Sequence, residues 1–223
     1  MISIVLMFVL SYFLGAMVPG FWIGKLFYHK DIRDEGSGNI GTTNSFRVLG
    51  PVAGIMTLVL DLLKGTAAGL LPLAFNSTIN PMLVGLVAVI GHTFSIWIKF
   101  KGGKAVATSA GVLLAYNPQF FCLIATVFIV MLLLTSMVSV SSMVGFSIAV
   151  IVSFYYHDMV LTVVAVALTI FVFYRHRANI SRIIHGTEST VPFGLYHYLH
   201  KKNKKPIAIV YRFFIFDAYQ TKL

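Results

Sequence analysis

Long apolar runs, interrupted by short polar segments, cover most of the chain. A helix needs roughly 20 mostly apolar residues to cross a bilayer, and it satisfies its backbone hydrogen bonds within its own segment. The pattern therefore predicts an all-α, multi-span integral membrane helical bundle. Helices are expected at about residues 2–24, 52–74, 82–98, 105–116, 119–135, 140–156 and 159–174. The 105–116 segment is short for a full crossing.

The composition is also that of a membrane protein. The 223 residues are 58% hydrophobic and 11% charged, with a mean hydropathy of +0.87, whereas about a quarter of the residues of a soluble domain are charged. The single cysteine, Cys122, lies in an apolar run, which excludes an intramolecular disulfide. The first apolar run lacks the basic segment and cleavage site of a signal peptide, so we expect a spanning helix there.

The positive charge is confined to a few inter-span segments. Of the 17 Lys and Arg residues, all but Lys64 lie at 25–51, at 99–104, or at and after Arg175. The positive-inside rule assigns these segments to the cytoplasm. This placement explains the net charge of +10 without a nucleic-acid partner. The turns that lack Lys and Arg, and are therefore expected outside, are 75–81, 117–118 and 157–158.

Seven crossings satisfy this distribution, with the N-terminus outside and the C-terminus in the cytoplasm. Five crossings satisfy it equally if the chain crosses twice, rather than four times, between Lys104 and Arg175. We favour seven. Residues 1–190 are expected to form the membrane-embedded domain, and residues 191–223 a basic cytoplasmic tail.

Three polar segments on the cytoplasmic side combine glycine, hydroxyl, amide and cationic groups, as phosphate-binding sites do. In the first, at residues 35–47, glycines alternate with short polar side chains, and a helix beginning near Thr43 would present its N-terminus and Arg47 to one oxyanion. An ordinary polar loop with a helix cap is the alternative. The candidate ligands of this segment are Ser37, Asn39, Thr43, Asn44 and Arg47.

The second polar segment, at residues 91–104, contains His92 and ends in Gly102-Gly103-Lys104. Glycine lets backbone N–H groups approach an anion, and a helix that begins after Lys104 favours negative charge at its N-terminus. The segment is not a nucleotide-binding loop, because Ala105 follows the lysine and Ile98 occupies the position of the first glycine. Lys99 and Lys101 are interpreted as charges that flank the membrane.

The third polar segment, at residues 175–188, continues the last span. On a helix, Arg175, Asn179 and Arg182 would share one stripe able to surround phosphate. A juxtamembrane basic helix that binds lipid headgroups is the alternative. The further candidates in this segment are His176, Arg177, His185 and Glu188.

Asp61 and Lys64 are spaced to face one another within the second span. The two residues could form a structural ion pair or a link to the polar site, and the sequence leaves both interpretations open. The histidines are scattered and the carboxylates are few, so we expect no metal site and no cofactor.

The three polar segments, in this order, resemble the motifs of the bacterial acyl-phosphate-dependent glycerol-3-phosphate acyltransferase family. The resemblance covers about residues 5–190, and the chain departs from the family pattern at Ala105 and Ile183. The matching residues are Ser37-Gly38-Asn39-x-Gly41-x-Thr43-Asn44 with Arg47 and Gly50, Gly91-His92 and Phe100-x-Gly102-Gly103-Lys104, Arg175-His176-x-x-Asn179-Ile180-x-Arg182 with Gly186 and Glu188, and Asp61-x-x-Lys64-Gly65.

The resemblance implies transfer of an acyl group from acyl phosphate to the sn-1 hydroxyl of glycerol 3-phosphate, at the cytoplasmic face of the cell membrane. The products would be lysophosphatidate and inorganic phosphate, in the first step of phospholipid biosynthesis. The sequence does not determine the oligomeric state, and a monomer is one of the states it allows. A transporter for a phosphorylated solute is the alternative function.

The expected substrate-binding residues are Ser37, Asn39, Thr43, Asn44, Arg47, Gly102, Gly103, Lys104, Arg175 and Arg177. The expected catalytic residues are His92, His176, Asn179 and Glu188. The general base is open between His92, His176, His185, Glu188 and the acyl phosphate itself, and we favour the last.

Overall fold

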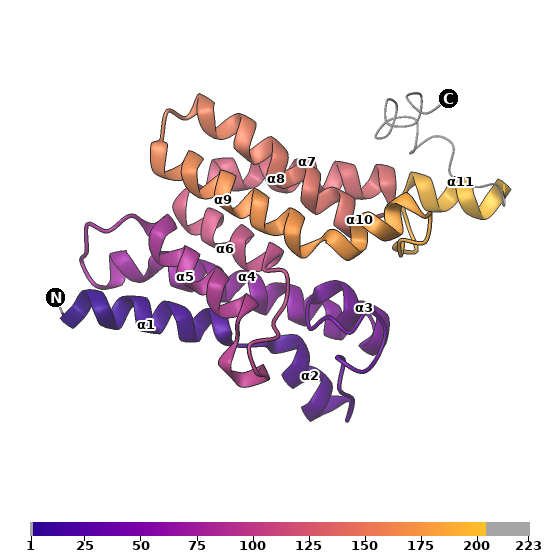
Figure 1. Cartoon of the computed structure of the whole chain (residues 1–223), viewed down its shortest axis with the longest axis horizontal. Helices are drawn as coiled ribbons and strands as arrows, with labels where there is room; N and C mark the ends of the chain where they lie inside the picture. The colour runs from indigo at the N-terminus through magenta and orange to yellow at the C-terminus, as the bar shows by residue number, and fades with distance from the viewer. Residues whose placement is uncertain (1, 204–223) are drawn as a thin grey trace, which may run out of the picture.

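The computed structural model describes the backbone of residues 2–203 and the side chains of residues 2–199, and all regular elements in that part are helical (Figure 1). The α-helices are α1 (Ile2–Ala16), α2 (Pro19–Phe27), α3 (Thr42–Leu49), α4 (Pro51–Ala74), α5 (Pro81–Thr93), α6 (Val106–Tyr116), α7 (Pro118–Thr135), α8 (Val138–Tyr155), α9 (Met159–Arg175), α10 (Arg177–Ile184) and α11 (Leu195–Asn203), with a short 3-10 helix, η1 (Ile96–Ile98), after α5.

The all-α membrane bundle is confirmed, since each expected apolar segment is helical. By length and composition, the described part has four helices able to cross a membrane, or six if the bent pairs α1–α2 and α9–α10 each form one span. Helix α6 is apolar but has only 11 residues. The seven crossings and the outside position of the N-terminus therefore stay predictions.

The expected continuous first span is instead two helices that meet at an angle of 47°. Pro19 has no backbone N–H and disfavours helical dihedrals at the residue before it, and Val18 accordingly has φ −123° and ψ 73°. Side chains from two distant parts of the chain satisfy the carbonyls that the break leaves free. Ser95 Oγ donates to Ala16 O at 2.5 Å, and Lys64 Nζ donates to Met17 O at 2.6 Å.

Helix α4 is central, because it packs against α1, α2, α3, α5 and α6. Its approach to α6 is close enough to require glycine at Gly65 and Gly111. A Cβ on Gly65 would lie 2.1 Å from the carbonyl oxygen of Thr108, and one on Gly111 would lie 2.0 Å from that of Leu62. The start of α6, and with it the preceding loop, is thereby fixed against α4.

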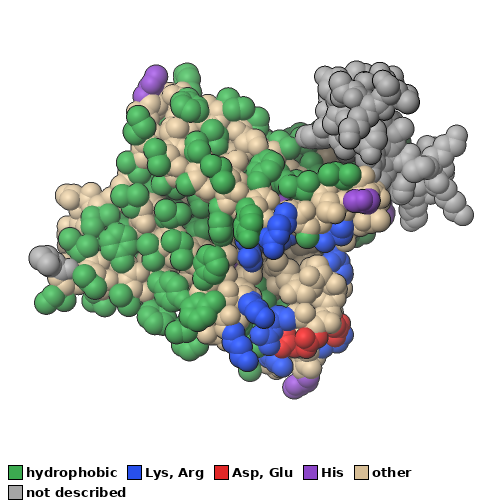
Figure 2. Space-filling view, viewed as in Figure 1, with side chains coloured by type: hydrophobic (Ala, Val, Ile, Leu, Met, Phe, Trp, Pro, Cys, Tyr) green, Lys and Arg blue, Asp and Glu red, His purple; other side chains and the backbone are tan. Residues whose placement is uncertain are grey.

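The polar segments gather at one end of the bundle. In Figure 1, α3 and α10 lie at the end away from the N-terminus, and Figure 2 shows visible Lys and Arg side chains on that half of the molecule, beside a flank of apolar side chains. Hydrogen bonds with Arg175 and Asn179 join the loop before α6 to the same region. A buried apolar cluster from α2, α3, α4, η1 and the 28–41 loop supports this end, and a second cluster joins α5 to α9.

The chain beyond residue 190 continues to contact the bundle. The Val191 N–H donates to Ser136 O at 2.8 Å, the His197 N–H donates to Ser136 Oγ at 3.0 Å, and α11 packs against α7. Residues on both sides of position 190 thus contact the bundle, and the division into residues 1–190 and a tail stays a prediction. The rest of the predicted basic tail, 204–223, lies outside the described residues.

Candidate active site

The loop between α5 and α6 folds back onto the end of α5. The Gly102 N–H donates to Thr93 O at 2.9 Å, and the Gly103 N–H donates to His92 O at 3.2 Å. A Cβ on Gly102 would lie 2.0 Å from His92 O, and one on Gly103 would lie 2.3 Å from His92 Nε2. The two glycines thus permit a close approach to α5. Their N–H groups are used within the loop, so the expectation that they help to hold an anion is not supported.

Lys104, at the end of this loop, joins the second polar segment to the third. Its Nζ donates to Asn179 Oδ1 at 2.5 Å, and Asn179 Nδ2 donates to Glu188 Oε1 at 2.6 Å. Arg182 Nε donates to Glu188 Oε2 at 2.8 Å. A lysine, an amide, a carboxylate and an arginine therefore form one continuous polar network.

The charges around Lys104 create a strongly cationic site. Burial lowers the pKa of Lys104 from 10.5 to about 8, Glu188 acts in the opposite direction, and Arg182, Arg175 and Arg47 lower the pKa further. Arg47 belongs to the first polar segment, so all three polar segments contribute positive charge around Lys104. Such an excess of positive charge favours a polyanionic ligand.

Arg175 and Arg177 differ in what they contact. Arg175 Nη2 donates to Gly102 O at 2.9 Å and to Gly103 O at 3.0 Å, so Arg175 holds the loop from the third polar segment. Arg177 is exposed and lies over the ring of Tyr174, 4.7 Å from its centroid. The structure therefore gives Arg175 a positioning contact and turns Arg177 towards Tyr174 rather than into the network.

In the first polar segment, Asn44 organises the loop instead of facing a ligand. It is 1% exposed, and its Oδ1 accepts from the Ser37 N–H at 2.9 Å. Its Nδ2 donates to Ile32 O at 2.8 Å and to Glu35 O at 3.1 Å. Because both ends of the amide are used, we assign Asn44 to positioning.

The remaining candidates of this segment lie on or near α3, which begins at Thr42, one residue before the expected start. Asn39 Oδ1 accepts from the Gly41 N–H at 3.0 Å and so shapes the turn before the helix. Ser37, Thr43 and Arg47 are exposed and available to a ligand.

The four candidate bases differ in access. Glu188 is only 6% exposed at its side chain, and its carboxylate accepts from Asn179, Arg182 and Ser139. His92 is 3% exposed and lies beneath Gly103. His185 is exposed, and its Nδ1 lies 2.7 Å from Ser181 O.

His176 has its Nδ1 2.8 Å from Val172 O. Since a carbonyl only accepts, we assign the proton of the neutral ring to Nδ1, which leaves Nε2 as an acceptor. The ring is buried at the junction of α9 and α10, and the charges of Lys104 and Glu188 act on it. The same argument assigns an acceptor Nε2 to His185, whose Nδ1 lies beside Ser181 O. His176 differs in that the charges of Lys104 and Glu188 act on its ring.

Ser139 is a site residue that the sequence analysis missed. It lies in the first turn of α8, and its Oγ donates to Glu188 Oε1 at 2.7 Å. Its neighbour Ser136 accepts from the backbone that follows Glu188. A signal was available, because the Ser-rich turn between the 119–135 and 140–156 segments falls on the cytoplasmic side in the seven-crossing topology.

The family model of glycerol-3-phosphate acyltransferase matches residues 5–186. A glycerol-3-phosphate acyltransferase of Latilactobacillus sakei is 55% identical over 202 residues, covering 90% of this chain and 98% of the relative. One of Lactiplantibacillus plantarum is 55% identical over 196 residues, covering 86% of this chain and 94% of the relative.

Two solved structures are also similar. Both are crystal structures of PlsY, an integral membrane glycerol 3-phosphate acyltransferase. Its glycerol 3-phosphate form has a TM-score of 0.80 and 32% identity, covering 85% of this chain and 96% of that one. Its lysophosphatidic acid form has a TM-score of 0.76 and 31% identity, covering 84% and 95%. With the family motifs assembled around one lysine, and with these similarities over nearly the whole chain, the protein belongs to the glycerol-3-phosphate acyltransferase family.

Proposed function

We propose that the protein transfers an acyl group from acyl phosphate to the sn-1 hydroxyl of glycerol 3-phosphate, giving lysophosphatidate and inorganic phosphate. The observation that carries the proposal is the Lys104–Asn179–Glu188 network, with the charges of Arg47, Arg175 and Arg182 around it. Two phosphate groups must be held close together in this reaction, and the network supplies cations from three separate segments. Membership of an acyltransferase family argues against the transporter alternative.

The phosphate of glycerol 3-phosphate is assigned to Lys104, Arg47 and Ser37. Arg47 and Ser37 are exposed at the same end of the bundle, and Lys104 is partly exposed. The acyl phosphate head is assigned to the neighbourhood of Asn179 and His176, with its chain between helices. Holding both reactants in reacting geometry supplies much of the rate.

The chemistry is a direct acyl transfer. The sn-1 oxygen attacks the acyl carbonyl carbon, a C–O bond forms, and the bond between that carbon and the phosphate oxygen breaks. The proton of the hydroxyl passes to the departing phosphate. Lys104 and the nearby arginines stabilise the negative charge that builds up on the carbonyl oxygen and the leaving phosphate.

The favoured proton acceptor is the acyl phosphate, because Glu188 is held by three donors and His92 is covered by Gly103. The reaction takes place at the cytoplasmic face of the cell membrane, where the Lys and Arg residues gather. The product then remains in the adjoining lipid.

The test is an assay of purified protein in lipid with acyl phosphate and glycerol 3-phosphate. We expect lysophosphatidate and phosphate in equal amounts, and no product from acyl-CoA as donor. Lys104→Met should lower kcat/KM by about 10²–10³-fold, the usual effect of removing one charge-stabilising group. Lys101→Met, an exposed lysine of the same loop, is the matched control and should retain activity.

Absence of lysophosphatidate from the wild-type protein, together with flux of glycerol 3-phosphate into liposomes, would reject the proposal in favour of transport. Transfer from acyl-CoA but not from acyl phosphate would keep the acyl transfer and reject the donor.

A further inference from the structure

Three polar side chains are buried between α4 and α5, where the proposed chemistry does not use them. Asp61 is 2% exposed, Lys64 is 6% exposed and His92 is 3% exposed. Lys64 Nζ lies 2.7 Å from Asp61 Oδ1 and 2.7 Å from His92 Nδ1. His92 Nδ1 is also 3.4 Å from Asp61 Oδ1. We call Asp61, Lys64 and His92 the buried triad.

Lys64 sets the protonation of the His92 ring. An ammonium group has three N–H donors and no acceptor. Its neighbours are Met17 O at 2.6 Å, Asp61 Oδ1 and His92 Nδ1. The contact with Asp61 Oδ1 is an ion pair rather than an oriented hydrogen bond. A charged Lys64 can only donate to Nδ1, so we assign the proton of the neutral ring to Nε2.

Nε2 lies on the edge of the ring that faces the loop between α5 and α6, which we call the catalytic loop. It lies 2.3 Å from the position that a Cβ on Gly103 would occupy, and the carbonyl of His92 accepts from the Gly103 N–H. His92 thus supports the loop through both its backbone and its ring. Arg175 holds the carbonyls of Gly102 and Gly103 from the other side.

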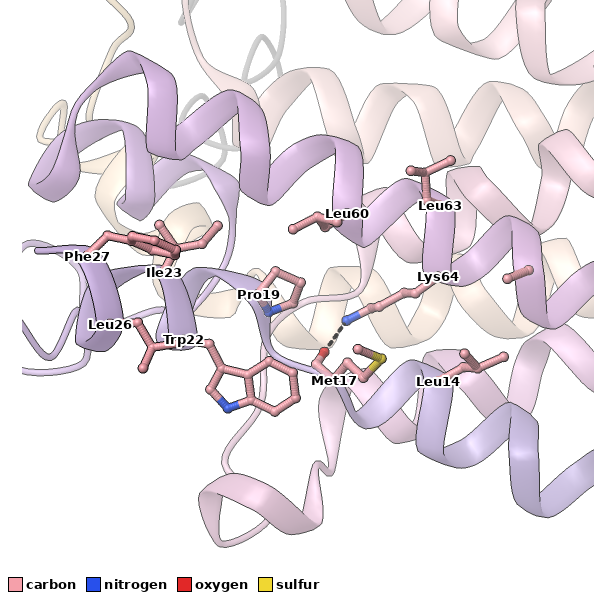
Figure 3. Close-up of a pocket in the computed structure, with 11 residues that line it drawn as sticks. Leu14, Met17, Pro19, Trp22, Ile23, Leu26, Phe27, Leu60, Leu63 and Lys64 are labelled. Atoms are coloured by element: carbon pink, nitrogen blue, oxygen red, sulfur yellow. Dashed lines mark hydrogen bonds between the residues drawn. The ribbon is translucent and has the colours of Figure 1, made fainter.

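The triad also reaches the break between α1 and α2. Figure 3 shows Lys64 extending from α4 to the carbonyl of Met17, at the edge of an apolar pocket of about 330 Å³. The break leaves this carbonyl without a partner inside a helix, and Lys64 supplies one. Lys64 therefore links the start of α2, and the first polar segment that follows α2, to His92 and the loop above it.

A buried ion pair is weak support for stability, since the cost of desolvating both charges offsets their attraction. Its effect on geometry is more direct. A series of contacts runs from Met17 O through Lys64 to His92, and the His92 ring lies against Gly103, one residue before Lys104. We propose that Asp61, Lys64 and His92 are positioning residues that fix the Gly102-Gly103-Lys104 loop and thereby set the affinity for the phosphate of glycerol 3-phosphate. This inference rests on the proposed function.

The test is the double variant Asp61→Asn/Lys64→Met, which removes both charges and keeps similar volumes. His92 Nδ1 then donates to the amide oxygen introduced at position 61, so the proton leaves Nε2. We expect KM for glycerol 3-phosphate to rise about 10–100-fold, the effect of a displacement of about 1 Å in a site. KM for acyl phosphate should stay within about twofold of the wild type, and Tm should change little.

Two measurements separate positioning from stability. The ¹⁵N resonances of the His92 ring, assigned by their loss in His92→Gln, should show the proton on Nε2 in the wild type and on Nδ1 in the double variant. His92→Gln leaves the Asp61–Lys64 pair intact and should raise KM for glycerol 3-phosphate in the same way.

Ser11→Ala is the matched control, because Ser11 Oγ makes a buried bond between α1 and α5, to Val84 O at 2.6 Å, away from the loop. It should lower Tm and leave both KM values unchanged. Folded variants of the triad with wild-type KM for glycerol 3-phosphate would overturn the proposal. So would a failure of both triad variants to fold, which would assign the triad to stability. A wild-type protein without acyl transfer would instead reject the proposed function.

Discussion

Lys104 is the residue at which the three polar segments meet. Its ammonium contacts Asn179, and the charges of Arg47, Arg175, Arg182 and Glu188 act on it. The residues around it divide into two groups. Asn44 uses its amide, and Arg175 its Nη2 group, to hold backbone, whereas Ser37, Thr43 and Arg47 remain exposed at the surface of the site.

The lowered pKa of Lys104 predicts a pH dependence of substrate capture. The lysine is protonated below its pKa of about 8 and loses its charge above that value. A phosphate monoester has its second pKa near 6, so the substrate stays a dianion throughout this range. We therefore expect kcat/KM for glycerol 3-phosphate to fall above about pH 8, approaching tenfold per pH unit.

The matched variant is Lys104→Arg, whose guanidinium stays charged in this range. Its kcat/KM should start lower, because the geometry differs, and should stay flat between about pH 7 and pH 9.5. Parallel profiles of the two enzymes would show that Lys104 does not titrate in this range.

At the scale of elements, the contact between α4 and α6 decides where the catalytic loop ends. Helix α6 is too short to be fixed by hydrophobic burial in a bilayer alone, and it begins two residues after Lys104. Gly65 and Gly111 allow its backbone to approach α4, and Thr66 Oγ1 donates across the contact to Gly111 O at 3.0 Å.

Two Gly→Ala substitutions test this contact. Gly111→Ala places a Cβ 2.0 Å from Leu62 O, and overpacking of this kind costs about 1–3 kcal/mol. Gly145→Ala in α8 places a Cβ 3.8 Å from the nearest side chain, Ile124, and should gain up to about 1 kcal/mol of helix propensity. Thermal unfolding in detergent should give a lower Tm for Gly111→Ala and an equal or higher Tm for Gly145→Ala. Equal losses would contradict the close α4–α6 contact.

At the scale of the whole molecule, the charged and uncharged ends of the bundle define an orientation in the membrane. Apart from Lys64, the Lys and Arg residues whose side chains the structure describes lie towards the end where α3 and α10 are, and the turns between α4 and α5 and between α6 and α7 lie at the other end (Figures 1 and 2). The positive-inside rule predicts that the charged end faces the cytoplasm.

Single cysteines in a Cys122→Ser background test this orientation. Thr78, in the turn between α4 and α5, and Ser181, in α10, are both exposed. A maleimide that does not cross membranes should label Thr78→Cys in intact cells, and label Ser181→Cys only after permeabilisation. The reverse pattern would invert the topology, and labelling of both in intact cells would place both ends of the bundle on the same side.

The sequence by itself determined the membrane bundle, the helical segments and the positions of the three polar segments. These follow from local patterns, since a run of apolar residues or a cluster of glycines and cations is recognisable wherever it stands in the fold. The candidates Lys104 and Asn179 were also identified from sequence, as was the ion-pair spacing of Asp61 and Lys64.

Only the tertiary structure decided which polar atoms are left for a substrate. The N–H groups of Gly102 and Gly103, the amide of Asn44 and Nη2 of Arg175 have partners within the protein, and Ser139 reaches Glu188 across 49 positions. Lys104 and Asn179 are separated by 75 positions. Such contacts depend on how the helices pack, and one break, at Val18–Pro19, changes the path of everything that follows. Local sequence determines which groups are present, but the distances between helices determine which of them are already satisfied.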